Sequence, residues 1–173
     1  NEGYLLGFLI GDGTLKDEGG VICVWGDNEE AESLMKAVGE AAYTLPHRSD
    51  FKGFQTMIGP RKKNRMRIAA LRDLAAAYNI IPGKKKLTDD IEKTGYDFYR
   101  GFLRGLFDTD GTVVGDHHKG LSIRLWQNDL ECLKRVQRML HRLGIASTIY
   151  QNRKHEDIKA LPDGKGGYKD YPV

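Results

Sequence analysis

The chain has 173 residues, with 27 Lys and Arg against 24 Asp and Glu and a net charge of +3. Its 40% apolar and 29% charged residues are ordinary for a globular protein and exclude a wholly disordered chain. The longest apolar stretch, residues 4–10, is far shorter than the roughly 20 residues that a membrane span needs. Cys23 and Cys132 lie apart in apolar surroundings, which predicts buried thiols and excludes zinc fingers and disulfide scaffolds. No targeting peptide precedes the first helical pattern, so we expect a cytoplasmic protein.

The first predicted element is an apolar helix over residues 3–13 that ends in Asp12-Gly13. Gly7 and Gly11 stand four positions apart and therefore share one face of this helix. Missing side chains on one face predict close packing against a second helix. We expect Gly13 to end the helix in left-handed backbone geometry.

The rest of the first half predicts alternating strands and amphipathic helices. Asp27 with Glu30 fits a capping box at the start of a helix. Alternating segments predict strands over residues 22–25, 53–58 and 66–68. A further short helix is expected over residues 72–78, and residues 84–86, all lysine, begin a connection to the second half.

The second half repeats the first. Residues 101–113 align without a gap on residues 3–15, with six identities in thirteen positions. A strand over 123–126, a capping box formed by Asn128 and Glu131, and a helix that ends before Gly144 follow in the same order. One further strand is expected over 146–150. A duplicated chain of this kind predicts an α+β fold in which the two apolar helices pack about a pseudo-twofold axis.

Asp12 and Asp110 each end one of these helices, where the helix dipole is already negative. Bringing the two helix ends together adds repulsion between the carboxylates. A divalent cation between them explains the arrangement, and oxygen ligands favour Mg²⁺. Beside a basic surface, Mg²⁺ indicates phosphodiester chemistry.

Basic residues are concentrated in two tracts without acidic residues, residues 51–72 and 134–155. Uncompensated Lys and Arg suit a polyanion such as nucleic acid, because phosphate contacts need positive charge gathered on one face. The alternative is that these side chains are spread over solvated faces.

The repeated segment resembles a known motif. Residues 103–111 are similar to the LAGLIDADG motif, and residues 5–13 match it with Ile10 in place of its first Asp. The chain is therefore identified as similar to the two-motif homing endonucleases, most of all to the intein type. The resemblance implies two αββαββα-like repeats, with the motif helices at their interface and curved antiparallel sheets facing DNA. Its implied parts are a first repeat (1–82), a lysine-rich linker (83–97) and a second repeat (98–173) that is truncated.

The resemblance also implies the site. Asp12, Asp110 and Lys85 become the catalytic residues, with Lys85 chosen from the run 84–86 by its position. Asp12 and Asp110 would bind Mg²⁺, or Mn²⁺ as a substitute, with help from the backbone carbonyls of Gly11 and Thr109. Asp108 takes a structural role in this reading.

Double-stranded DNA with a long, partly asymmetric target is the expected partner of a monomer, and no membrane is involved. Strand alternation places Ile123 and Leu125 inward and Arg124 outward, whereas Trp25 and Trp126 are expected to pack. Side chains able to pair with bases or phosphates are the predicted DNA contacts. They are Gln55, Arg61, Lys63, Arg65, Arg124 and Arg153.

The implied function is a site-specific endonuclease that makes double-strand cuts. Two alternatives stay open, an inactive DNA-binding module of the same fold and an RNA maturase. The chain begins with Asn1 and ends with Tyr171-Pro172-Val173, so it lacks the terminal residues that protein splicing requires.

Overall fold

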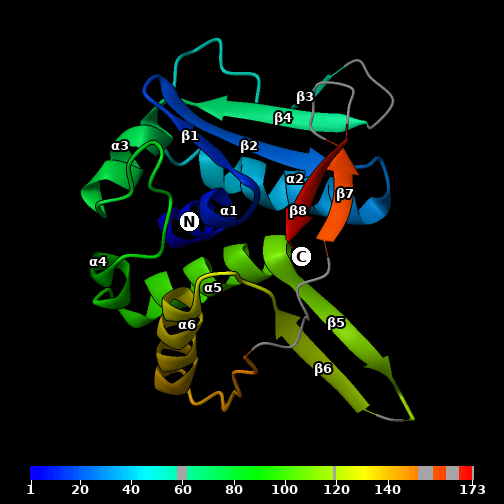
Figure 1. The fold of residues 1–173 in the computed structure, drawn as a ribbon. Coiled ribbons are helices and arrows are strands. Elements are labelled where there is room, and N and C mark those ends of the chain that lie inside the picture. Colours follow the sequence, from blue (N-terminus) through cyan, green and yellow to red (C-terminus); the bar gives the residue numbers. More distant parts are fainter. Residues whose placement is uncertain (58–61, 119, 152–157, 163–167, 173) are drawn as a thin grey trace.

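The computed structural model describes residues 1–57, 62–118, 120–151, 158–162 and 168–172, the last two ranges as backbone only. The elements in chain order are α1 (Glu2–Asp12), β1 (Thr14–Lys16), β2 (Gly19–Trp25), α2 (Glu29–Ala42), β3 (Gln55–Met57), β4 (Lys63–Ile68), α3 (Ala70–Ala77), α4 (Asp89–Glu92), α5 (Tyr96–Asp110), β5 (Gly111–Asp116), β6 (Gly120–Leu125), α6 (Leu130–Arg142), β7 (Ile158–Pro162) and β8 (Tyr168–Pro172). The fold is α+β, as the sequence predicted (Figure 1). No helix among the described residues is long and apolar enough to cross a membrane.

Helices α1 and α5 lie side by side at the centre of the molecule (Figure 1). A Cβ atom added at Gly7 would lie 2.0 Å from the carbonyl oxygen of Phe102. A Cβ atom at Gly105 would lie 2.2 Å from the carbonyl oxygen of Tyr4. Only glycine leaves room for two backbones at this separation, so the close packing predicted from the glycine spacing is confirmed.

The glycines that end the two motif helices are not left-handed, and that expectation was wrong. Gly13 and Gly111 have φ values of −83° and −85°, which any residue can adopt. Glycine is needed at both positions because a Cβ atom would have no room. A Cβ at Gly13 would lie 2.6 Å from the Cα of Leu9, and one at Gly111 would lie 2.3 Å from the carbonyl oxygen of Phe107. The chain therefore turns directly from the helix into a strand.

The first half forms a four-stranded antiparallel sheet in the order β1-β2-β4-β3. One face contributes buried side chains, including Ile22 opposite Met66. The same face carries Gly20, where a Cβ would lie 2.6 Å from a methyl carbon of Leu71 in α3. Helices on this side thus cover the sheet. We call the other face, which carries Lys63, Arg65 and Arg67 of β4, the open face; burial alternates along β4, whereas Val21 and Cys23 of β2 are buried on this face as well.

The second half has a smaller sheet. Among the described strands, β5 and β6 pair only with each other, with Val113 opposite Ile123. Ile123 is 72% exposed and Leu121 is 68% exposed, so the expectation that Ile123 points into the core was wrong. Leu125, at the inner end of β6, does pack against the core. Within the described residues no helix covers the outer part of this hairpin in the way that α3 covers the first sheet.

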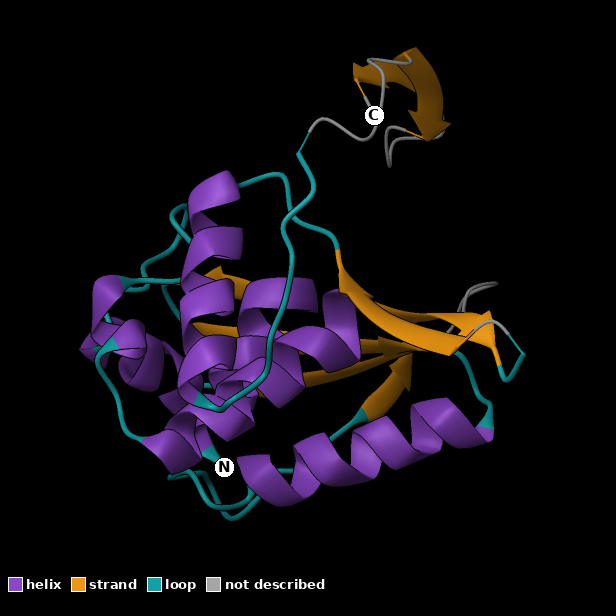
Figure 2. Cartoon of the chain, turned by 90° about the horizontal axis from the view of Figure 1, so that it is seen from below, coloured by secondary structure: helices purple, strands orange, loops and turns teal. Residues whose placement is uncertain are grey.

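Two further expectations need correction. The helix caps lie one residue later than predicted, at Asn28, whose side chain accepts from Ala31 N, and at Asp129, which accepts from Glu131 N and Cys132 N. Residues 146–150 form no strand, and the chain instead pairs β7 with β8. Figure 2 shows this pair beside the C-terminus, set apart from the helices.

Replacing Gly7 with Ala should destabilise the fold by roughly 1–3 kcal/mol, because the new Cβ collides with the backbone of α5 and overpacks the interface. Gly39→Ala in α2 is the matched control, since nothing lies within 4 Å of a Cβ there. It should stabilise the protein by about 0.5–1 kcal/mol through helix propensity. Urea unfolding of both variants measures the difference, and equal free energies of unfolding would contradict the packing account.

Candidate active site at the tips of the motif helices

Asp12 and Asp110 are the last residues of α1 and α5. The two helix tips touch one residue earlier, where a Cβ at Gly11 would lie 1.9 Å from Oγ1 of Thr109. Thr109 turns this hydroxyl back on its own helix, donating to the carbonyl oxygens of Gly105 (3.2 Å) and Leu106 (2.9 Å). The structure therefore brings together all four residues that were expected to bind the metal ion.

The two carboxyl groups destabilise each other's charged form. Burial raises the pKa of Asp110, and the neighbouring charge of Asp12 raises it further. Burial also raises the pKa of Asp12, against the opposing effect of the Lys85 ammonium. The site thus concentrates negative charge where solvation is incomplete, which favours a bound cation.

Lys85 belongs to the connection between the two halves, and its side chain extends to the tips of α1 and α5. Its Nζ donates to the carbonyl oxygens of Gly11 (3.0 Å) and Gly13 (2.6 Å). Burial lowers the pKa of Lys85, whereas the charges of Asp110 and Asp12 raise it. Its neighbour Lys86 points elsewhere and pairs with Asp129 at 2.9 Å. Among residues 84–86, the geometry therefore singles out Lys85.

Gln127 belongs to this site and was missed by sequence reasoning. Its Nε2 donates to Oδ2 of Asp110. The pairing of Gly111 with Leu125 brings the chain after β6 back to the end of α5, so Gln127 lies next to the carboxylate. In the sequence, Gln127 is recognisable only as a polar residue directly after a predicted strand, and it belongs to no motif.

The residues present fit a hard divalent cation. Within the described residues no group of three or more His, Cys, Asp or Glu gathers into a metal-binding cluster. Asp12 and Asp110 supply two carboxylates, and the carbonyl of Gly11 is a third oxygen beside them. Mg²⁺ suits such a sparse set, because it commonly keeps water and phosphate oxygens among its ligands.

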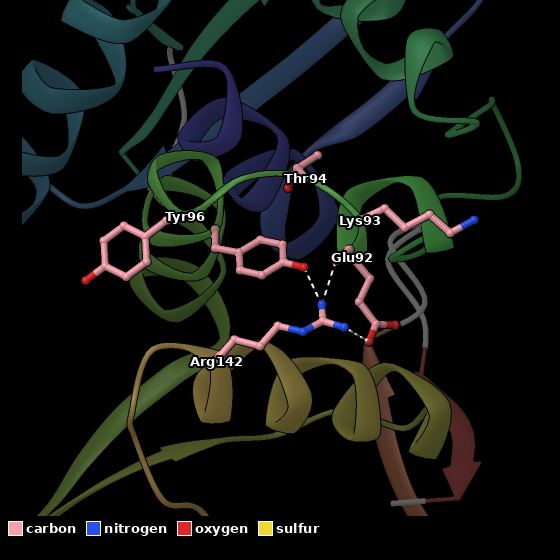
Figure 3. Close-up of a pocket in the computed structure, with 6 residues that line it drawn as sticks. Glu92, Lys93, Thr94, Tyr96 and Arg142 are labelled. Carbon is pink, nitrogen blue, oxygen red and sulfur yellow. Dashed lines mark hydrogen bonds and ion pairs between the residues drawn. The ribbon is translucent and has the colours of Figure 1, made fainter.

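A cluster around Glu92 fixes α6 beside the site. Glu92 is buried and accepts two hydrogen bonds from Arg138, at 2.6 and 2.8 Å. Arg142 donates to the backbone carbonyl of Glu92 at 2.7 Å and to the hydroxyl of Tyr99, at the edge of a pocket of about 400 Å³ (Figure 3). The hydrogen bonds from Arg138 lower the pKa of Glu92. These arginines of the second basic tract therefore bind protein, contrary to the expectation that the tract faces a polyanion.

The open face of the first sheet carries several predicted DNA contacts. Lys63 and Arg65 lie on β4 opposite Trp25 and Cys23, on the face away from buried Met66, and Gln55 pairs with Arg65 from β3. Arg124 is exposed on β6, where its Nε donates to Ser122.

Two of the predicted contacts, Arg61 and Arg153, lie outside the described residues. Trp25 and Trp126, expected to pack, are 48% and 50% exposed, so neither belongs to the core. The ammonium of Lys63 lies 4.8 Å from the ring centroid of Trp25. Both indoles thus add aromatic surface outside the core, and that of Trp25 lies beside a basic side chain.

Comparison with known proteins agrees with this geometry. Residues 97–162 match the LAGLIDADG-like domain family. The fold is similar to that of the homing endonuclease I-DmoI in complex with DNA and Ca, with a TM-score of 0.52, 18% identity, and coverage of 87% of this chain and 75% of that one. The match to the LAGLIDADG-like domain thus covers the second half of the chain, and the fold as a whole is similar to that of I-DmoI. Mesophilic variants of I-DmoI match with a TM-score of 0.50 and 17% identity over 96% of this chain and 84% of theirs.

Two much longer proteins contain segments similar to this chain. One is the ribonucleoside-diphosphate reductase NrdEB subunit alpha of Bacillus subtilis (strain 168), 30% identical over 184 residues. The alignment covers 98% of this chain and 17% of that protein. The other is a DNA polymerase of Thermococcus litoralis, 35% identical over 69 residues, which are 39% of this chain and 4% of the polymerase. The chain thus spans a small part of each relative.

Asp12→Asn should stabilise the protein at neutral pH. The pKa of Asp12 is raised above its ordinary value of 3.8, so the charged carboxylate lowers stability above that raised pKa, and this cost disappears as the pH falls below 3.8. After solvent screening we expect a gain of a few tenths to about 1 kcal/mol at pH 7 and none near pH 3. Thermal unfolding at both pH values measures it. Asp17→Asn, in the turn after β1, is the control that should change neither.

Proposed function

We propose that this chain is a site-specific DNA endonuclease that hydrolyses phosphodiester bonds with Mg²⁺, or with Mn²⁺ as a substitute. One observation carries the proposal: Asp12 and Asp110 end two helices whose tips touch, with the ammonium of Lys85 beside them. Paired carboxylates that hold a divalent cation, next to a group able to neutralise phosphate, are what hydrolysis of a phosphodiester requires.

Each residue has a definite task in this mechanism. Asp12 and Asp110 hold the cation, and Gln127 orients the Asp110 carboxylate through its amide. Lys85 donates to a non-bridging oxygen of the scissile phosphate and stabilises the charge that develops there. When bound, Mg²⁺ would supply Lewis acidity toward the phosphate and toward the attacking water. The helix tips are rigid because two backbones in contact hold them, which fixes the distance between these groups.

In this proposal, the two sheets form the surface that binds DNA. The open face of β2 and β4 begins next to the end of α1, since β1 follows Asp12 after one residue and pairs with β2. Arg65 and Gln55 suit base edges in the major groove, and Lys63 suits phosphate. The second sheet is smaller, so the two halves would contact unequal half-sites. A single chain with both halves acts as a monomer on a partly asymmetric target.

We further propose that the domain derives from an intein. Its similarity to short segments of a reductase subunit and of a DNA polymerase supports an origin as a unit embedded in unrelated host enzymes. Insertion within host proteins is the arrangement expected of the intein type.

Cleavage of a plasmid library tests the function directly. The chain is incubated with supercoiled plasmids that carry randomised inserts, with Mg²⁺, and linear products are sequenced. A recurring cut site is the expected result. Binding without nicking at any site would identify an inactive DNA-binding module, and preference for folded intron RNA in competition would identify a maturase.

Asp110→Asn should reduce cleavage by at least about 10³-fold while DNA affinity changes less than about threefold, because only the cation ligand is lost. Asp97→Asn lies in the first turn of the same helix, at its opposite end, and serves as the control with unchanged cleavage. Single-turnover cleavage and gel-shift titration give the two numbers. Cutting at the normal rate by Asp110→Asn would remove this residue from the mechanism.

Arg65→Ala should weaken DNA binding and reduce the slope of log affinity against log salt by about 1 if the guanidinium contacts phosphate. If it contacts a base, target preference at one position should relax instead, at a cost of roughly 1–3 kcal/mol. Fluorescence anisotropy at several salt concentrations separates the two modes. Arg48→Ala, whose side chain pairs with Asp50 in an exposed loop, is the control. Unchanged affinity and preference in Arg65→Ala would exclude this face of β4 as a contact.

A further inference from the structure

The ammonium group of Lys85 lies at the helix tips, where the candidate site would hold a metal ion, and we expect it to affect the affinity for that ion. Its Nζ lies 3.0 Å from the carbonyl oxygen of Gly11 and 2.6 Å from that of Gly13, the residues on either side of Asp12. A positive group held by backbone carbonyls and flanked by carboxylates has the same chemical surroundings as a bound hard metal ion.

Lys85 is also the counter-charge of the site. Among the described residues, it is the only cation whose charge shifts the pKa of both Asp12 and Asp110. The other polar contact of Asp110 is the uncharged amide of Gln127. Removing the ammonium would leave two partly buried carboxylates repelling each other, without the one described positive charge that acts on both.

The Gly11 carbonyl oxygen, which accepts from Lys85, is also one of the three oxygens assigned to the metal ion. A divalent ion coordinated by Asp12, Asp110 and the Gly11 carbonyl would lie within a few ångströms of the ammonium, and their repulsion is strong where solvent is partly excluded. One of the two has to leave.

The structure provides a place for the lysine to go. Lys84, Lys85 and Lys86 line a hollow of about 400 Å³ together with Gly13 to Leu15. Gly83 precedes these three lysines. Its φ of +77° is a backbone conformation that few other residues adopt. A long, flexible side chain anchored there can move its ammonium from the helix tips into the hollow without any change in the fold.

We propose that Lys85 is the resident cation of this site, that it competes with the divalent metal ion for the oxygens at the helix tips, and that it moves away when the metal ion binds. The inference rests on the proposed metal-dependent function. It adds that a phosphate in the hollow attracts the ammonium outward and so promotes metal binding. By linkage, the metal ion then promotes phosphate binding to the same extent.

Isothermal titration of the purified chain with Mn²⁺ alone tests the competition. Lys85→Met keeps the length of the side chain and removes its charge, so Mn²⁺ should bind about tenfold more tightly or better. Lys86→Met is the matched control, because Lys86 is exposed and pairs with Asp129, and its affinity should equal that of the wild type. Asp12→Asn should lose most of the binding.

The outcomes are separable. Equal Mn²⁺ affinity of Lys85→Met and the wild type, with binding lost in Asp12→Asn, would overturn the competition and leave the proposed metal site standing. Absence of binding in every variant would overturn metal use itself. Circular dichroism confirms that each variant is folded, and Lys85→Gln replaces Lys85→Met if the latter is not. A rise of the melting temperature with Mn²⁺ that is larger in the lysine variant than in the wild type is an independent measure of the same effect.

Discussion

Contact between the backbones of α1 and α5 is the constraint on which the rest of this structure depends. Gly7 and Gly105 bring each helix against carbonyl oxygens of the other, so neither helix can shift without a collision. Because the C-terminal ends of α1 and α5 meet, Asp12 and Asp110 are held close together although both carry negative charge. Stability gained along the interface offsets the repulsion at its end, so helix packing holds the two carboxylates of the candidate site together.

The two halves share this interface and differ beyond it. The first sheet has four strands and a helix over its inner face, whereas β5 and β6 stand as a pair with apolar side chains in solvent. The second half is fixed in another way, through the ion pairs of Glu92 with Arg138 and Arg142 of α6. That cluster also determines where Gln127 lies, since Gln127 precedes α6 by three residues. Duplication thus preserved the centre and left the periphery free to diverge.

The sequence predicted what depends on spacing. Glycines four residues apart predicted the helix contact, and the repeated Asp-Gly predicted the carboxylate pair. Lys85 was added by the family resemblance. What it missed depends on tertiary surroundings. Gly13 is needed for space rather than for left-handed backbone, and Ile123 is exposed because nothing described covers its strand. Gln127 is recognisable only once the strand register is known, and the pairing of Arg138 with Glu92 only once α6 is placed.

Buried and more exposed positions alternate along the short strand β4. Asn64, Met66 and Ile68 are buried, while the residues between them reach the open face. Substitutions at the intervening positions alter the surface without changing the volume of the interior. Such a strand allows the exposed surface to change with little loss of folded protein, so under the proposed function new targets would be accessible through single exchanges.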